Sequence, residues 1–229
     1  MICIISPLSN VGRFFILSRY MKYDLEKIKY AGSSESPVCV IIAADKRDAF
    51  SECAEGVLHA YIPIENWNEE LSPWPSPPVF GDAPFRDGAG KLLSFITDEL
   101  IPEIDTTCGK KRFVIAGYSL SGLFSLYAIC RSDSFTAAAA VSPSVWFPGW
   151  IEFAGKEKPH SEYVYLSLGD REEKTRNPVM ATVGDCIRKT EKIFSDKGIR
   201  CSLEWNEGGH FKDPGLRMKK GIEAVLRNI

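Results

Sequence analysis

The sequence lacks the marks of several classes of protein. Its seven cysteines include no C-x-x-C pair, so neither a zinc site nor a dithiol redox motif is predicted. The formal net charge is only −2 and no basic block is present, so a nucleic-acid partner is not expected. No apolar run approaches the roughly 20 residues that span a bilayer, and the N-terminus lacks the basic stretch of a signal peptide. We therefore expect no membrane partner either.

What is present is ordinary for a globular protein. The 229 residues are 45% hydrophobic and 25% charged, which is enough to bury a substantial core, and we expect one domain over residues 1–229. The cysteines are odd in number and scattered, and several lie inside apolar runs, such as Cys39 in VCVII. This usage is typical of buried thiols in a reducing compartment, and it predicts a cytoplasmic protein. The sequence carries no signal for an oligomeric state.

Apolar runs of strand length alternate with helical patterns along the chain. VCVIIAA (38–44) is typical of a strand buried on both faces, and VLHAYIP, RFVIAGYS, AAAAVSP, YVYLSLG and CSLEW are further strand candidates. Apolar residues recur at helical spacing over 92–104, 183–194 and 216–226, and a buried helix is predicted from about Leu120 to Cys130. The segment 66–84 is rich in Pro, Trp and Ser, and we expect a long irregular loop there. The alternation predicts an α/β fold whose mostly parallel sheet is covered on both faces.

The stretch GYSLSG (117–122) is the most informative part of the chain. It places Ser119 on the turn between a predicted strand and a predicted helix, with Gly117 two positions earlier, which is most of the nucleophile elbow G-x-S-x-G. Such a turn exposes a serine hydroxyl to a base and to a carbonyl carbon. Ser121 stands where the pattern has its second glycine, which weakens the match. The alternative interpretation is that Ser119 only caps the helix that follows.

A serine nucleophile of this fold is followed along the chain by an acid and then by a histidine. Of the three histidines, one precedes Ser119 and one lies in a charged loop, whereas His210 lies in NEGGHFKD, between the last predicted strand and the last helix. A base in that position can reach a serine at the carboxyl edge of the sheet. The acid should follow the strand YVYLSL, where GDREEKT offers Asp170, Glu172 and Glu173. Spacing alone does not choose among the three.

Together these segments resemble the esterase family of the α/β-hydrolase superfamily that includes enterochelin and related siderophore esterases and S-formylglutathione hydrolase (esterase D). AGYSLSGLFSLYA is similar to that family's elbow, VSPSVWF to its Ser-Pro-Ser-aromatic strand exit, YVYLSLGDREEK to its acid loop and EGGHF to its histidine loop. The resemblance runs from about Val38 to the C-terminus. It implies the α/β-hydrolase fold and a serine esterase whose acid is Glu172, with Asp170 in reserve.

The resemblance also implies an oxyanion hole, in which one donor is the backbone N–H of Leu120. The second donor is expected in ADKR after the first buried strand, at Asp45 or Lys46, although relatives often have glycine in that loop. The expected mechanism is acyl transfer through a covalent intermediate on Ser119, with His210 moving the proton and no metal or organic cofactor. The alternatives are a thioesterase or acyltransferase on the same triad, or a binding module that has lost activity.

Several tryptophans lie in predicted loops: Trp67, Trp74, Trp146 and Trp150. Trp146 follows a strand at the carboxyl edge, where ligands bind in parallel sheets. Indole faces suit a ring-bearing group better than a long alkyl chain, so Trp67, Trp74 and Trp146 are predicted to bind substrate. Lys46 and Arg47 could add positive charge for an anionic substrate. The expected partner is a small-molecule ester, such as a siderophore lactone or an acylated sugar; alternatively, the tryptophans cap the core and the two cations are ordinary solvated surface.

Overall fold

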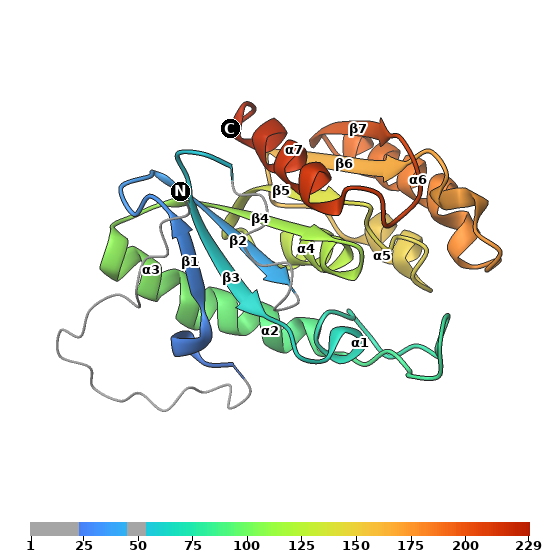
Figure 1. Cartoon of the computed structure of the whole chain (residues 1–229), viewed down its shortest axis with the longest axis horizontal. Helices are drawn as coiled ribbons and strands as arrows, with labels where there is room; N and C mark the ends of the chain where they lie inside the picture. The colour runs from blue at the N-terminus through green and yellow to red at the C-terminus, as the bar shows by residue number, and fades with distance from the viewer. Residues whose placement is uncertain (1–22, 45–53) are drawn as a thin grey trace.

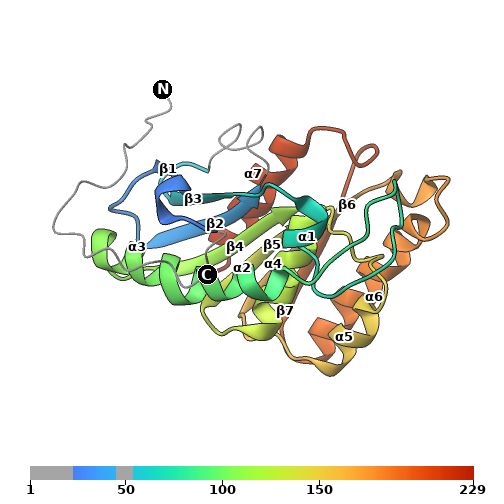
Figure 2. The same ribbon diagram turned by 90° about the horizontal axis from the view of Figure 1, so that it is seen from below.

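The computed structural model describes residues 23–44 and 54–229, which build a seven-stranded sheet with helices on both faces (Figure 1 and Figure 2). The sheet order is β1-β3-β2-β4-β5-β6-β7, and β1 is antiparallel to β3 whereas all other neighbours are parallel. The predicted α/β fold with a mostly parallel sheet is thereby confirmed. The strands are β1 (Lys29–Gly32), β2 (Val38–Ala44), β3 (Leu58–Pro63), β4 (Arg112–Tyr118), β5 (Phe135–Val141), β6 (Tyr163–Gly169) and β7 (Arg200–Asn206).

The helices divide unequally between the two faces of the sheet. One face is covered by α7, which contacts β4, β5 and β6, and the other carries a larger core to which α2, α4, α5 and α6 contribute. The helices are η1 (Leu25–Lys27), α1 (Trp67–Glu70), α2 (Ala89–Phe95), η2 (Ile96–Leu100), α3 (Ile101–Cys108), α4 (Leu120–Arg131), α5 (Trp150–Lys156), η3 (Glu172–Lys174), η4 (Met180–Thr182), α6 (Val183–Asp196) and α7 (Pro214–Leu226). Among the described helices, none has both the length and the apolar character needed to cross a membrane.

Some local predictions need correction. The helix predicted over 92–104 is longer, because α2, the π-helical η2 and α3 follow one another without a break. The segment 66–84 is not entirely irregular, since it contains α1 and a bridge between Ser76 and Phe85. Trp150 does not lie in a loop: it begins α5, is fully buried, and its indole N–H donates to the Thr190 hydroxyl at 3.0 Å.

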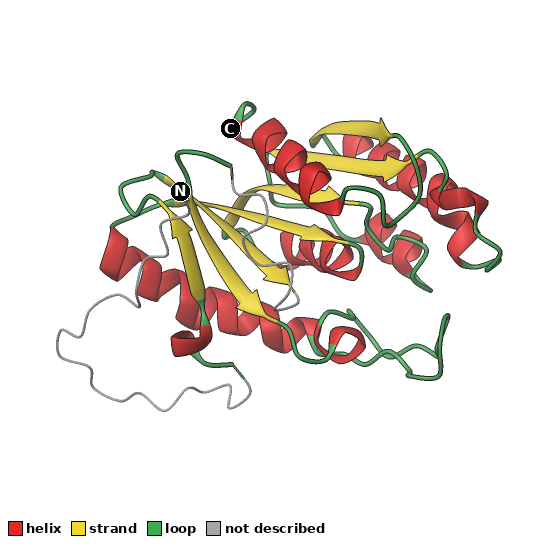
Figure 3. Cartoon of the chain, in the orientation of Figure 1, coloured by secondary structure: helices red, strands yellow, loops and turns green. Residues whose placement is uncertain are grey.

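The parallel strands direct their carboxyl ends toward one edge, where the connections to the following helices begin (Figure 3). Helices cover both faces of β2 and β6, which explains why these strands are almost entirely apolar, with Ser167 in β6 as the polar exception. The loops at the carboxyl edge after β4, β5, β6 and β7 therefore sit on a rigid base. These four loops carry the predicted elbow, the Ser-Pro-Ser segment, the acid loop and the histidine loop.

A polar side chain in the sheet has a consequence for stability. His59 lies in β3, is fully buried, and neither ring nitrogen makes a well-formed hydrogen bond. Burial lowers the pKa of His59 from 6.5 to about 4, although the Val57 carbonyl counteracts part of this effect. The folded protein therefore keeps the imidazole neutral at a pH where the unfolded chain would protonate it.

We predict that the free energy of unfolding falls as the pH is lowered from about 6.5 to 4, because the unfolded state binds more protons there, with His59 contributing up to about 3 kcal/mol. Urea denaturation at several pH values would measure this loss. His59→Phe should remove His59's part of the pH dependence, whereas His160→Gln, at an exposed position, should not. Equal pH dependence in wild type and His59→Phe would contradict the prediction.

Candidate active site

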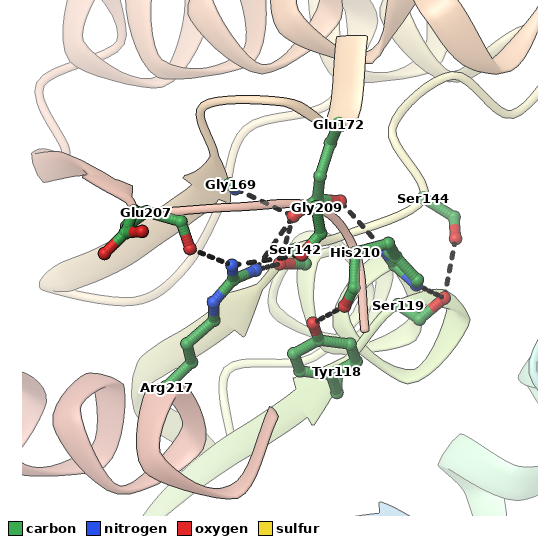
Figure 4. A network of polar contacts seen from close by, with 10 residues as sticks. All are labelled: Tyr118, Ser119, Ser142, Ser144, Gly169, Glu172, Glu207, Gly209, His210 and Arg217. Carbon is green, nitrogen blue, oxygen red and sulfur yellow. Dashed lines mark hydrogen bonds and ion pairs between the residues drawn. The ribbon is translucent and has the colours of Figure 1, made fainter. Parts of the chain in front are cut away.

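Three side chains from three separate loops meet at the carboxyl edge of the sheet (Figure 4). Ser119 stands between β4 and α4, Glu172 begins η3 after β6, and His210 lies between β7 and α7. The Ser119 Oγ is 3.1 Å from His210 Nε2, and the His210 Nδ1 is 2.7 Å from Glu172 Oε2. The structure thus brings the predicted nucleophile, base and acid into one hydrogen-bonded series.

The elbow holds Ser119 in a conformation that L-residues rarely adopt. Its φ is 59° and its ψ is −122°, a strain of roughly 1–3 kcal/mol that the surrounding contacts must maintain. The Ser119 N–H donates to the Val141 carbonyl, and the Ser144 N–H donates to the Ser119 carbonyl, both at 3.0 Å. These bonds fix the peptide groups on both sides of the side chain, so that the hydroxyl projects toward the base.

The two small positions of the elbow have different explanations. A Cβ on Gly117 would lie 2.3 Å from the Ser121 carbonyl group, so only glycine fits there. Ser121 is buried, and its hydroxyl donates to the Ala43 carbonyl in β2 at 2.6 Å. The serine that weakens the sequence match therefore has a partner, and it fastens the elbow to the neighbouring strand.

The Glu172 carboxylate is nearly inaccessible to solvent and accepts several hydrogen bonds. Besides His210, its donors are the Gly169 N–H and the Ser142 hydroxyl, both at 2.7 Å, and the Arg217 guanidinium at 3.1 Å. Burial raises the pKa of Glu172, but the hydrogen bonds and charge of His210, together with Gly169 and Ser142, outweigh it and leave the pKa below its usual value. The carboxylate is therefore ionised at neutral pH.

The other two acids of the loop have different partners. The Asp170 Oδ1 accepts from the Gly208 N–H at 2.8 Å, so this side chain holds the backbone of the histidine loop. Glu173 pairs with Arg188 at 3.3 Å. Among the three candidates, Glu172 is thus the acid that contacts the imidazole, whereas Asp170 supports the loop that carries it.

The predicted oxyanion donors can be followed only in part. Leu120 is the first residue of α4, so its N–H has no acceptor within the helix, and no hydrogen bond from it is found within residues 23–44 and 54–229. This N–H is therefore available at the elbow to an oxygen on the substrate. Asp45, Lys46 and Arg47 lie outside the described residues.

Ser119 and His210 line a cavity of about 320 Å³, and the described residues around it are mostly apolar. Trp67 lines this cavity, together with Tyr61, Tyr118, Phe211 and Met218. The exposed Phe211 and His210 also border a second hollow, which is lined in part by Trp146, Arg171 and Lys174.

Trp74 is not among the described residues that line either hollow. Its indole N–H donates to the Pro148 carbonyl at 2.8 Å, and the ring packs on Phe147 and Phe153. Of the predicted substrate-binding tryptophans, Trp67 thus borders the cavity at Ser119, Trp146 borders the neighbouring hollow, and Trp74 belongs to the packing of the protein.

Sequence reasoning missed three residues that complete the arrangement. The Tyr118 hydroxyl donates to the His210 carbonyl, Ser142 donates to Glu172, and Arg217 binds Glu172 from α7. Ser142 belongs to the Ser-Pro-Ser segment, so the motif itself was a signal. Tyr118 stands next to the nucleophile, but tyrosine in that position has no diagnostic meaning by itself. Arg217 resembles any cation on an amphipathic helix.

The fold and the elbow geometry place the chain among the α/β-hydrolases, and comparison with known proteins gives the family. A family model described as "Putative esterase" matches residues 46–197, which is more than half of the chain. The chain belongs to this esterase family, so the family predicted from the sequence is confirmed.

Among curated proteins, the ferri-bacillibactin esterase BesA of Bacillus subtilis (strain 168) is 29% identical over 164 residues, covering 66% of this chain and 56% of BesA. The match thus spans little more than half the length of that relative. Similar solved structures include the siderophore hydrolase EstA from Aspergillus nidulans, with a TM-score of 0.66, 20% identity and coverage of 88% of this chain and 89% of EstA. The enterobactin esterase FES from Shigella flexneri has a TM-score of 0.64 at 15% identity and covers 88% and 55% of the two chains. These likenesses in structure show the shared fold.

Proposed function

We propose that this protein hydrolyses carboxylic esters through an acyl-enzyme formed on Ser119. The observation that carries the proposal is the hydrogen-bonded series from Ser119 through His210 to a buried, ionised Glu172, beside the available Leu120 N–H. Membership of an esterase family supports the same chemistry. The same arrangement speaks against a helix cap as the function of Ser119, because the Ser119 side chain makes no capping bond to α4.

In the proposed reaction, neutral His210 takes the Ser119 proton at Nε2 while Ser119 Oγ attacks the carbonyl carbon. The negative charge that develops on the carbonyl oxygen is held by the Leu120 N–H, a type of donor whose loss typically costs about 10²–10³ in rate. His210 then passes its proton to the leaving alcohol as the C–O bond breaks. Water repeats the sequence on the acyl-enzyme and releases the acid. Glu172 holds the imidazole by Nδ1 and stabilises its protonated form.

We further propose an ester with a ring-bearing group as substrate. The cavity of about 320 Å³ beside Ser119 has aromatic residues in its wall, among them Trp67, which suits a planar ring. The adjoining hollow carries Arg171 and Lys174, which would favour negative charge on the part of the substrate that reaches it. A siderophore lactone combines these properties, and the similarity to siderophore esterases and hydrolases supports it; an acylated sugar would use the same cavity.

The setting that we propose is a single domain in the cytoplasm. The described cysteines are free thiols, and burial raises the pKa of Cys39 and Cys130, so neither is poised to react. A chain whose described cysteines are all unpaired is typical of a reducing compartment.

Ser119→Ala should lower the hydrolysis of a short-chain p-nitrophenyl ester at least about 10³-fold and should abolish labelling by a fluorophosphonate, because the nucleophile is gone. The matched control is Ser144→Ala, whose hydroxyl lies 3.4 Å from that of Ser119 and should not be needed for labelling. Thermal unfolding of each variant checks that it is folded. Labelling of folded Ser119→Ala at wild-type rate would refute the nucleophile, and a wild type that is neither labelled nor active would refute the esterase.

Replacement of the two acids should separate their roles. Glu172→Gln should lower kcat by about 10²–10⁴, because the amide no longer stabilises the imidazolium. Asp170→Asn should lower kcat less than about 10-fold, because the amide oxygen can still accept from the Gly208 N–H. Steady-state kinetics on the same ester would measure both. The reverse ranking would assign the catalytic acid to Asp170.

Substrate preference should follow the aromatic wall of the cavity. Among p-nitrophenyl esters, we expect kcat/KM for phenylacetate to exceed that for decanoate at least about 10-fold. Trp67→Ala should raise KM for the ring-bearing ester several-fold, whereas Trp74→Ala, which alters a side chain packed on Phe153, should not. A steady preference for long alkyl chains, or equal effects of the two tryptophan variants, would contradict the substrate class and leave the triad unaffected.

A further inference from the structure

Arg217 is a buried cation beside the proposed triad. It is the fourth residue of α7, and only 3% of its side chain is exposed. Its Nη1 donates to Glu172 Oε1 at 3.1 Å and to Ser142 Oγ at 3.2 Å, and its Nη2 donates to the Glu207 carbonyl at 2.9 Å and to the Gly209 carbonyl at 3.1 Å (Figure 4). One guanidinium thus has four acceptors in three different loops.

The acceptors of Arg217 belong to parts of the site whose relative positions set the geometry of the proposed triad. Glu172 and Ser142 form the acid side of the triad, whereas the Glu207 and Gly209 carbonyls belong to the loop that carries the base. Gly209 immediately precedes His210, and the His210 carbonyl itself accepts from the Tyr118 hydroxyl. The backbone of the histidine loop is therefore held from two sides. A planar guanidinium can bind several acceptors in fixed directions, which a lysine ammonium cannot reproduce.

The helix that carries Arg217 is itself firmly placed. Gly221 lies one turn further along α7, and a Cβ at that position would be 2.9 Å from the Tyr165 ring and 3.0 Å from a Val141 methyl group. Glycine therefore lets α7 approach β5 and β6 closely. Because residues four apart lie on the same side of a helix, this contact fixes the base of the Arg217 side chain as well.

The charge of Arg217 also matters for Glu172. The ionisable groups that face this carboxylate are His210 from the histidine loop, Arg217 from α7 and, nearby, Tyr118 from β4. His210 gains and loses its proton in every proposed reaction cycle, whereas an arginine stays charged throughout. Arg217 is therefore the constant positive partner of a buried negative charge.

We propose that Arg217 is a positioning residue of the active site, which locks the acid loop to the histidine loop so that His210 stays within reach of both Glu172 and Ser119. This inference rests on the proposed function. It differs from a merely stabilising role, because it requires that the loss of Arg217 changes the turnover and the His210–Glu172 hydrogen bond in protein that remains folded.

The kinetic test compares Arg217→Met and Arg217→Lys with Lys220→Met, an exposed cation on the same helix whose partner, Glu204, lies outside the triad. We expect Arg217→Met to lower kcat about 10²-fold with KM changed by less than about threefold, as for a misplaced catalytic group. Arg217→Lys should lower kcat about 10-fold, because a lysine ammonium cannot reproduce the forked contacts of the guanidinium. Lys220→Met should match wild type.

The second measurement does not need a substrate. The proton between His210 Nδ1 and Glu172 should give a downfield NMR resonance in wild type and in Lys220→Met, and we expect it to be lost in Arg217→Met. A wild type that cleaves no ester would overturn the proposed function, while this resonance would still test Arg217. Wild-type kcat and an unchanged resonance in folded Arg217→Met would overturn the positioning role. If that variant does not fold, Arg217→Lys with wild-type kcat would do the same.

Discussion

The Glu172 carboxylate is withdrawn from solvent at the carboxyl edge of the sheet, and it receives hydrogen bonds from β6, from the loop after β5, from the histidine loop and from α7. An unpaired charge in such a place is costly, so each donor has to be in position when the protein folds. The loops after β5, β6 and β7 are consequently gathered around one anion. These contacts also fix the position of the proposed base, because His210 is one of the four donors.

Much of this arrangement is readable in the sequence because it depends on local signals. Val38–Ala44 is apolar throughout and Tyr163–Gly169 is apolar except for Ser167, since helices cover both faces of the sheet there. The elbow at Ser119 has a recognisable spacing. Short elements are less visible: β1 has four residues and α5 has seven, too few to establish a period. The antiparallel edge of the sheet and the helix that begins at Trp150 were accordingly not predicted.

The rest of the site depends on contacts between distant segments. The choice between Asp170 and Glu172 is decided by which carboxylate the histidine loop meets, and two residues of separation do not reveal this. Arg217 lies next to Leu216 and Met218 in a helix that also carries Lys219 and Lys220, so only the packing of α7 on the sheet distinguishes it. Trp74 lies in a segment rich in Pro and Trp, but the chain there folds back onto Pro148 and Phe153. A loop position in the sequence therefore did not mean a position in the cavity.

The cavity beside Ser119 is lined by residues from two separate stretches of the chain. The proposed triad and the side chains that hold it come from residues 118–217, which include the ends of β4, β5, β6 and β7 and the start of α7. Trp67, by contrast, approaches the cavity from α1. One part of the cavity wall is thus encoded outside the stretch of sequence that supplies the proposed triad. The segment around α1 can therefore change to fit a different ester while every residue of the proposed triad is kept.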